Sequence, residues 1–232
     1  MVGSGSWIDP VPLHEMATLG LLSRARRGAA SYRPFDRRRD GFLAGEGGAA
    51  LVLERRGHAA ARSARVLATI EGVASATEPM PGLGVSDRVT LRAMQLALDD
   101  AHRGIADIGL ICPHGAGTPR GDRSEARSML ELLGDAAGRV PISALKPYTG
   151  HMGAASDLAE VILGVFAVAQ GTAPATPNFE ASEPQLAGLR VSAQPQRCQH
   201  PRLLSASFGI GGQGSAVVAS APHVTDYDDG HS

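Results

Sequence analysis

The chain has few cysteines and few aromatic residues. Its 232 residues include two cysteines, Cys112 and Cys198, which are too few for a disulfide framework and favour a reducing compartment. Aromatic residues make up 4% of the chain, whereas glycine is abundant at 29 residues. This composition favours an α/β protein with tight turns between strands and helices over a β-sandwich with an aromatic core.

The chain also lacks a strong net charge and long apolar runs. Its formal net charge is −1 at pH 7, so no basic surface for nucleic acid or for an anionic membrane is predicted. No 18-residue apolar run is present, and no signal-peptide pattern opens the sequence. We therefore expect a soluble, cytoplasmic protein that binds neither nucleic acid nor membranes.

Apolar patterning predicts alternating strands and helices. Helices are expected at 14–27, at 86–101 with Ser86 as the N-cap, at 122–134 with Gly134 as the stop, and at 154–169. Short apolar runs predict strands at 49–53, 65–74, 108–111, 140–142, 203–206 and 215–219. This alternation is typical of a layered α/β fold with a largely parallel sheet. Residues 226–232 are polar, and we expect them to be disordered.

Three loops that follow predicted strands carry the polar residues best suited to chemistry. They are His114-Gly115-Ala116-Gly117-Thr118-Pro119 with Gly121-Asp122 and Glu125 behind it, Lys146-Pro147-Tyr148-Thr149-Gly150-His151, and Ser207-Phe208-Gly209-Ile210-Gly211-Gly212. Ligands of α/β sheets gather in loops outside the strand ends, so these loops are the candidate site.

In this order and at these separations, the three segments resemble the C-terminal half of the β-ketoacyl synthases of fatty-acid and polyketide assembly. That family shows His-Gly-Thr-x-Thr, Gly-Asp-x-x-Glu, Lys-x-x-x-Gly-His and Ser-Phe-Gly-Phe-Gly-Gly. Residues 33–36, 39–42 and 45–47 match the charged segment that precedes these motifs in the family.

The resemblance covers Met1 to about Ala219 and implies a thiolase-like, layered αβαβα fold. Residues 1–57 would be the last part of the N-terminal half of that fold. Residues 58–222 would be its C-terminal half, followed by a disordered tail at 223–232.

The resemblance implies decarboxylative Claisen condensation of acyl and malonyl thioesters on acyl carrier protein. His114 and His151 would donate N–H groups to the thioester oxygen, where negative charge develops. Lys146 would be a charged lysine held by Glu125 as its acidic partner. No cysteine or carboxylate spacing completes a metal site around the histidines, and no cofactor is implied beyond the phosphopantetheine of the carrier protein.

Other residues are implied to hold the substrate. Thr118 resembles the hydroxyl that grips the pantetheine arm, and the remaining candidates are Phe208, Gly209, Ile210 and Gly211. Three positions depart from the family. Ala116 stands where a second hydroxyl is usual, and Ile210 replaces a gating phenylalanine. Asp157 replaces a glycine, so the close helix packing that the family has at this position is not predicted here.

A ketosynthase needs a cysteine at a strand-to-helix turn, where the helix N-terminus lowers the thiol pKa. In the family this cysteine precedes the segment that Met1 to Ser6 resembles. Cys112 has no helix start behind it and Cys198 follows a polar loop, so we expect neither to replace it. A sheet without the preceding strands would have open edges and an uncovered apolar face, so we expect a hetero-oligomer with another polypeptide.

Three interpretations stay open. The first is a catalytic subunit or half of a β-ketoacyl synthase, whose cysteine comes from a ketosynthase half or from a full ketosynthase subunit. The second is a non-catalytic partner that resembles the chain-length factors, which Ala116, Asp157 and Ile210 favour. The third is a fragment of a longer enzyme. The acyl chain length and the choice between fatty-acid and polyketide pathways are not predicted.

Overall fold

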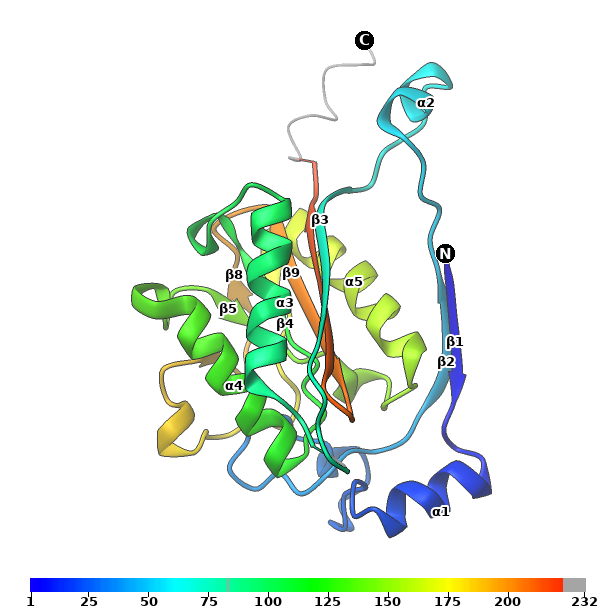
Figure 1. Cartoon of the computed structure of the whole chain (residues 1–232), viewed down its shortest axis with the longest axis vertical. Helices are drawn as coiled ribbons and strands as arrows, with labels where there is room; N and C mark the ends of the chain where they lie inside the picture. The colour runs from blue at the N-terminus through cyan, green and yellow to red at the C-terminus, as the bar shows by residue number, and fades with distance from the viewer. Residues whose placement is uncertain (83, 223–232) are drawn as a thin grey trace.

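The computed structural model describes residues 1–82 and 84–222, so the expected tail at 223–232 lies outside the described residues. A six-stranded sheet forms the main body (Figure 1). Its strand order is β3 (Thr69–Thr77), β10 (Gln213–Ser220), β9 (Arg202–Gly209), β4 (Leu110–Cys112), β5 (Pro141–Ile142) and β7 (Arg190–Val191). The pairs β9–β4, β4–β5 and β5–β7 are parallel, whereas β10 is antiparallel to both neighbours, so the sheet is mixed.

Helices cover both faces of this sheet (Figure 1). On one face lie α3 (Asp87–Asp100) and α4 (Pro119–Leu133), and on the other lies α5 (Ala154–Ala169). Ser86 caps α3 as predicted, because its hydroxyl accepts the backbone N–H of Val89. Gly134 ends α4 with a φ of +46°, and the bounds of α5 coincide with the predicted helix.

Two apolar clusters, one on each face, hold the layers together. Strand β9 contributes to both, because successive side chains of a strand point to opposite faces. Leu204 packs with the α3 and α4 side chains, and Leu203 packs on the α5 side. A Cβ at Gly164 of α5 would lie 2.7 Å from the Leu203 methyl groups, so the glycine permits this close approach of helix and sheet. Each fully buried leucine stabilises the fold by about 1.5–3 kcal/mol.

A separate two-stranded ribbon lies against α5, away from the main sheet (Figure 1). It pairs β1 (Val2–Ser6) with β2 (Glu46–Ala50), antiparallel. The layers therefore run helices, sheet, helix, ribbon, as a layered α/β fold predicts. The close contact between β1 and the segment before α5 requires glycine, because a Cβ at Gly5 would lie 2.1 Å from the carbonyl oxygen of Met152.

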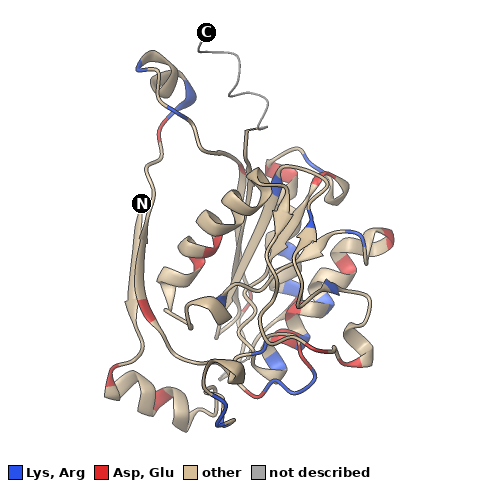
Figure 2. Cartoon of the chain, turned by 180° about the vertical axis from the view of Figure 1, so that it is seen from behind, with Lys and Arg blue, Asp and Glu red and all other residues tan. Residues whose placement is uncertain are grey.

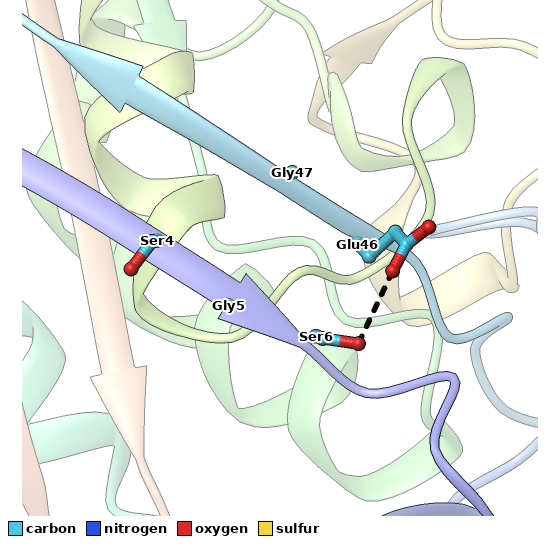
Figure 3. Close-up of a pocket in the computed structure, with 5 residues that line it drawn as sticks. All are labelled: Ser4, Gly5, Ser6, Glu46 and Gly47. Atoms are coloured by element: carbon cyan, nitrogen blue, oxygen red, sulfur yellow. Dashed lines mark hydrogen bonds between the residues drawn. The ribbon is translucent and has the colours of Figure 1, made fainter.

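The ribbon carries little charge, as Figure 2 shows, and Glu46 is the only charged residue of its two strands. Its surface has an open hollow lined by Ser4, Gly5, Ser6, Glu46 and Gly47 (Figure 3). In this hollow the Ser6 hydroxyl donates a hydrogen bond of 3.3 Å to Glu46. The lining is small and polar.

The remaining elements are short. They are α1 (Pro10–Thr18), α2 (Arg56–Ala61), the paired strands β6 (Thr172–Ala173) and β8 (Gln196–Arg197), and 3₁₀ turns at Gly28–Ser31, Ile105–Asp107, Gly134–Ala136, Lys146–Tyr148 and Pro184–Leu186. The predicted helix over 14–27 is wrong beyond Thr18, because Gly20 takes a φ of +69° and Leu22 then bridges to Phe42. Within residues 1–82 and 84–222, no helix is long and apolar enough to cross a membrane.

Candidate active site

The first predicted loop begins at the end of β4, and α4 holds its backbone. The N–H groups of His114 and Gly115 donate to the two carboxyl oxygens of Glu125, at 2.6 and 2.9 Å. Gly115 has a φ of +53°, which turns the chain sharply after the histidine. Burial raises the pKa of Glu125 to about 8 against these two hydrogen bonds. Glu125 therefore fixes the position of His114 through the backbone.

The predicted pairing of Lys146 with Glu125 is wrong, because the acidic partner of Lys146 is Glu160 of α5. The Lys146 ammonium donates to Glu160 Oε2 at 2.7 Å and to the His114 carbonyl oxygen at 2.7 Å. Lys146 is the only lysine of the chain, and its side chain is completely buried. One signal for Glu160 was present in the sequence. Asp157 and Glu160 lie three residues apart in an otherwise apolar helix, so they share one face.

His151 lies in the loop before α5, where it forms an isolated bridge with Ala44. Its ring packs against Trp7 and Phe42, with centroid distances of 4.4 and 5.0 Å. The Gly153 N–H donates to His151 Nδ1 at 3.2 Å. A nitrogen that accepts a hydrogen bond carries no proton, so in the neutral ring the hydrogen is on Nε2.

The two histidines meet as predicted, although they come from loops 37 positions apart in the sequence. Their ring centroids are 5.2 Å apart, with the planes at 70°. Burial and the nearby charge of Lys146 together lower the pKa of His114 to about 4. Burial and the neighbouring His114 lower the pKa of His151 to about 2. Both rings are therefore neutral at pH 7.

Asp157 and Ser207 belong to the same cluster. The Ser207 hydroxyl lies 3.2 Å from His114 Nδ1. Oδ1 of Asp157 lies 3.8 Å from that nitrogen and 3.8 Å from the Lys146 ammonium. Burial raises the pKa of Asp157, but His114, Lys146 and Ser207 together hold it below its usual range. Asp157 is thus a carboxylate inside the site, where the family motif has a glycine.

The candidate substrate residues surround this cluster at different depths. The Phe208 ring lies 4.5 Å from the His114 ring. Thr118 is the N-cap of α4, and its hydroxyl oxygen accepts the Gly121 N–H at 3.2 Å. Gly209 is the last residue of β9, and Ile210 and Gly211 lie in the turn between β9 and β10, where the Ile210 side chain is exposed. Their contact with substrate stays a prediction.

Neither cysteine is placed to act as the nucleophile. Cys112 is buried in the α5-side cluster, and its sulfur lies 3.1 Å from where a Cβ of Gly164 would be. Burial raises its pKa well above the ordinary value, and burial raises the pKa of Cys198 to about 11. In the part of the chain that the structure describes, no group of three or more His, Cys, Asp or Glu side chains could hold a metal ion.

The layered fold and the neutral histidine pair, in the loops that follow β4 and precede α5, define a thiolase-like protein. More specifically, the chain belongs to the β-ketoacyl synthase family. The model of the β-ketoacyl synthase N-terminal domain matches residues 1–59, and the model of the C-terminal domain matches residues 67–180.

Similar proteins come from polyketide assembly. The tetracenomycin polyketide synthase ketoacyl synthase alpha subunit of Streptomyces glaucescens is 37% identical over 201 residues, which cover 85% of this chain and 47% of that protein. The beta subunit of the same synthase is 36% identical over 202 residues, which cover 86% of this chain and 48% of that protein. The chain therefore spans about half the length of these curated relatives.

A solved structure has the same fold. It is AntDE:AntF, described as a type II PKS acyl-carrier protein in complex with its ketosynthase bound to the hexaketide. The TM-score is 0.87 with 29% sequence identity, over 96% of this chain and 56% of that one. The match confirms the thiolase-like fold that the motifs imply.

Proposed function

We propose that this chain supplies the two-histidine half of a β-ketoacyl synthase, whose cysteine nucleophile comes from another polypeptide. The assembled enzyme would condense an acyl thioester with a malonyl thioester on acyl carrier protein. The cysteine first accepts the acyl group. Malonyl thioester then loses CO₂, and the resulting carbanion attacks the acyl-cysteine, which releases the thiolate and leaves a β-ketoacyl thioester.

The observation that carries this proposal is the neutral imidazole pair of His114 and His151, with ring centroids 5.2 Å apart. Decarboxylation builds negative charge on the thioester oxygen, and a preorganised N–H donor in a dry site stabilises that charge strongly. His151 has the required tautomer, with its hydrogen on Nε2. Lys146 would contribute a fixed positive charge behind His114.

A nucleophile other than Cys112 or Cys198 is supported by the state of these two cysteines. A reactive thiol needs a lowered pKa and access to substrate, and Cys112 and Cys198 have raised pKa values in buried positions. Exposed apolar side chains support a partner surface. Phe166 and Leu163 of α5 are 48% and 42% exposed, and Val52 after the ribbon is 86% exposed.

The test is reconstitution with the partner. The chain is purified from its own host, co-purifying chains are identified by native mass spectrometry, and the assembled complex is assayed for CO₂ release from malonyl-carrier protein. His114→Ala is expected to lower that release by about 10²–10³-fold, as loss of an aligned catalytic group does. His58→Ala is the matched control, because His58 is an exposed histidine on α2. A well-folded chain that never acquires a cysteine-bearing partner would contradict the proposal.

A non-catalytic role is the second candidate, and Asp157 favours it. A carboxylate beside His114 and Lys146 would repel the carboxylate of a malonyl group. The resemblance to the tetracenomycin beta subunit is nearly as strong as that to the alpha subunit. In this case His114→Ala would leave the condensation rate of the complex unchanged, and the partner would be a complete ketosynthase.

A further inference from the structure

The position of Asp157 bears on which nitrogen of His114 carries the hydrogen. Oδ1 of Asp157 is buried and forms no hydrogen bond at ordinary distance, although 44% of the Asp157 side chain as a whole is exposed. His114 Nδ1 and the Lys146 ammonium both face this oxygen at 3.8 Å. The Lys146 ammonium already donates to Glu160 and to the His114 carbonyl oxygen. A buried carboxylate oxygen left without donors is costly, so neighbouring protons are expected to turn toward it.

Two arrangements of protons are possible around Nδ1 of the neutral His114 ring. With the hydrogen on Nδ1, the ring donates toward Ser207 and Asp157, and the Ser207 hydroxyl is available to donate to the carboxylate. With the hydrogen on Nε2, Nδ1 is a lone pair that must accept from the Ser207 hydroxyl. Asp157 then loses the donors from His114 and Ser207, keeps only the Lys146 ammonium at 3.8 Å, and faces that lone pair. Only the first arrangement satisfies all three groups.

We propose that Asp157, together with Ser207, is a positioning residue that keeps the hydrogen of His114 on Nδ1 and leaves Nε2 as a proton acceptor. The two histidines are then unequal, because the Gly153 N–H holds His151 in the opposite tautomer. His151 donates from Nε2, and His114 accepts at Nε2. This differs from the expectation that both histidines donate to the thioester oxygen, and the carboxylate at position 157 is the reason we propose.

Asp157 is well placed to do this through its own charge. It lies in the first turn of α5, where the helix dipole favours a negative charge. His114, Lys146 and Ser207 hold its pKa below the usual range, so it is ionised at neutral pH. An ionised carboxylate can only accept hydrogen bonds, so it favours the tautomer of the neighbouring ring that has its hydrogen on the nitrogen facing the carboxylate.

The catalytic consequence rests on the proposed function, whereas the tautomer does not. In a condensing complex, His114 would act as a general base at Nε2 and His151 as the donor to the thioester oxygen. In Asp157→Ala, His114 would no longer present an unprotonated Nε2 as the base. We expect this to lower turnover by about 10²-fold, with little change in KM.

The direct test is nitrogen NMR of the full chain labelled with ¹⁵N-histidine. The two ring nitrogens of a neutral histidine have well-separated shifts, so the spectrum reads the tautomer without any activity. His114→Gln and His151→Gln assign the signals. In the unchanged protein we expect His114 to be protonated on Nδ1 and His151 on Nε2. In Asp157→Ala the His114 hydrogen should move to Nε2, while the His151 signals stay in place.

Two controls keep this result interpretable. Asp157→Leu keeps a similar side-chain volume and removes both acceptor oxygens, so it replaces the alanine variant if that variant fails to fold. Asp99→Asn removes an exposed carboxylate from α3 and should leave the His114 signals unchanged. A His114 ring with its hydrogen on Nε2 in the unchanged protein overturns the proposal. So does a tautomer that stays on Nδ1 in both Asp157 variants.

Activity of the assembled complex separates this inference from the proposed function. A tautomer shift in Asp157→Ala accompanied by the fall in turnover supports both. The same shift in a complex whose activity never depended on His114 keeps the positioning role and rejects the condensing function.

Discussion

Lys146 and Glu160 form an ion pair with 2.7 Å between Nζ and Oε2, and both side chains are buried. They join two elements, because Lys146 lies in the loop after β5 and Glu160 lies in the second turn of α5. Lys146 also holds the His114 carbonyl oxygen, so the pair connects the β4 loop to the helix that follows His151. The geometry of the site depends on this connection.

The first prediction concerns the stability that depends on this pair. Glu160→Gln removes the carboxylate that lies 2.7 Å from the buried ammonium and leaves Asp157 Oδ1, 3.8 Å away, as its nearest counter-charge, so we expect the free energy of unfolding to fall by about 3 kcal/mol. Urea unfolding followed by circular dichroism measures it. Glu131→Gln, an exposed position on α4, should change stability by less than about 0.5 kcal/mol. A similar small loss in Glu160→Gln would show that the ion pair is not buried in solution.

Replacing both partners should behave differently from replacing one. In Lys146→Met with Glu160→Leu, both charges of the ion pair are removed, and apolar side chains fill their space. We expect this double variant to be more stable than Glu160→Gln alone, because removing both charges also removes their desolvation cost. The same unfolding measurement applies, and additive losses from the two substitutions would contradict the expectation.

Because Lys146 is the only lysine, its burial can be measured by acylation. An amine-reactive acetyl ester should modify only the N-terminal amine of the folded chain, since the Met1 residue is exposed and Lys146 is not. In denaturant a second acetyl group should appear on Lys146. Intact-mass spectrometry counts the groups. If the native chain gained its second acetyl group as fast as the denatured chain does, Lys146 would be accessible in the folded state.

The histidine pair should make stability fall in mild acid. Burial lowers the pKa of His151 to about 2 from an ordinary value of 6.5, so below pH 6.5 the unfolded chain binds a proton that the folded chain does not. Stability is therefore full above that pH and is lost as the pH falls, by about 1.4 kcal/mol per pH unit for such a group.

The His151→Gln variant isolates this contribution. Its free energy of unfolding should depend less steeply on pH between about pH 6 and pH 5, by roughly that same amount per unit. Urea titrations at several pH values compare the two slopes. Equal slopes would show that His151 is protonated normally in the folded chain.

Exposed apolar residues on α5 should affect assembly and not folding. Phe166→Ser and Leu163→Ser change side chains that are 48% and 42% exposed, so thermal unfolding of the chain alone should shift little. Under the proposed function, the double variant should weaken association with the cysteine-bearing partner by about fivefold or more, which corresponds to a loss of about 1 kcal/mol of interface free energy. Leu67→Ser, an exposed leucine outside α5, is the control. Native mass spectrometry of mixed chains reports the complex.

Much of the fold could be predicted from local patterns. The Ser86 cap, the glycine stop at Gly134 and the apolar run of α5 mark helices through chemistry that acts within a few residues. The helix expected over 14–27 was wrong in its second half. Its apolar spacing continues past Thr18, but Gly20 turns the chain and Leu22 then bridges to Phe42, a contact that no local pattern encodes.

By itself, the sequence determined the family, the order of the strands and helices, and the two histidines, because motifs and apolar periodicity are properties of neighbouring residues. Only the tertiary structure decided the partners of the charged groups. It assigned Glu160 and not Glu125 to Lys146, and it brought Asp157 to His114. The physical reason is that Glu125 lies on α4 and Glu160 lies on α5, and these helices pack on opposite faces of the sheet. The face on which each helix packs therefore determines which carboxylate meets the lysine.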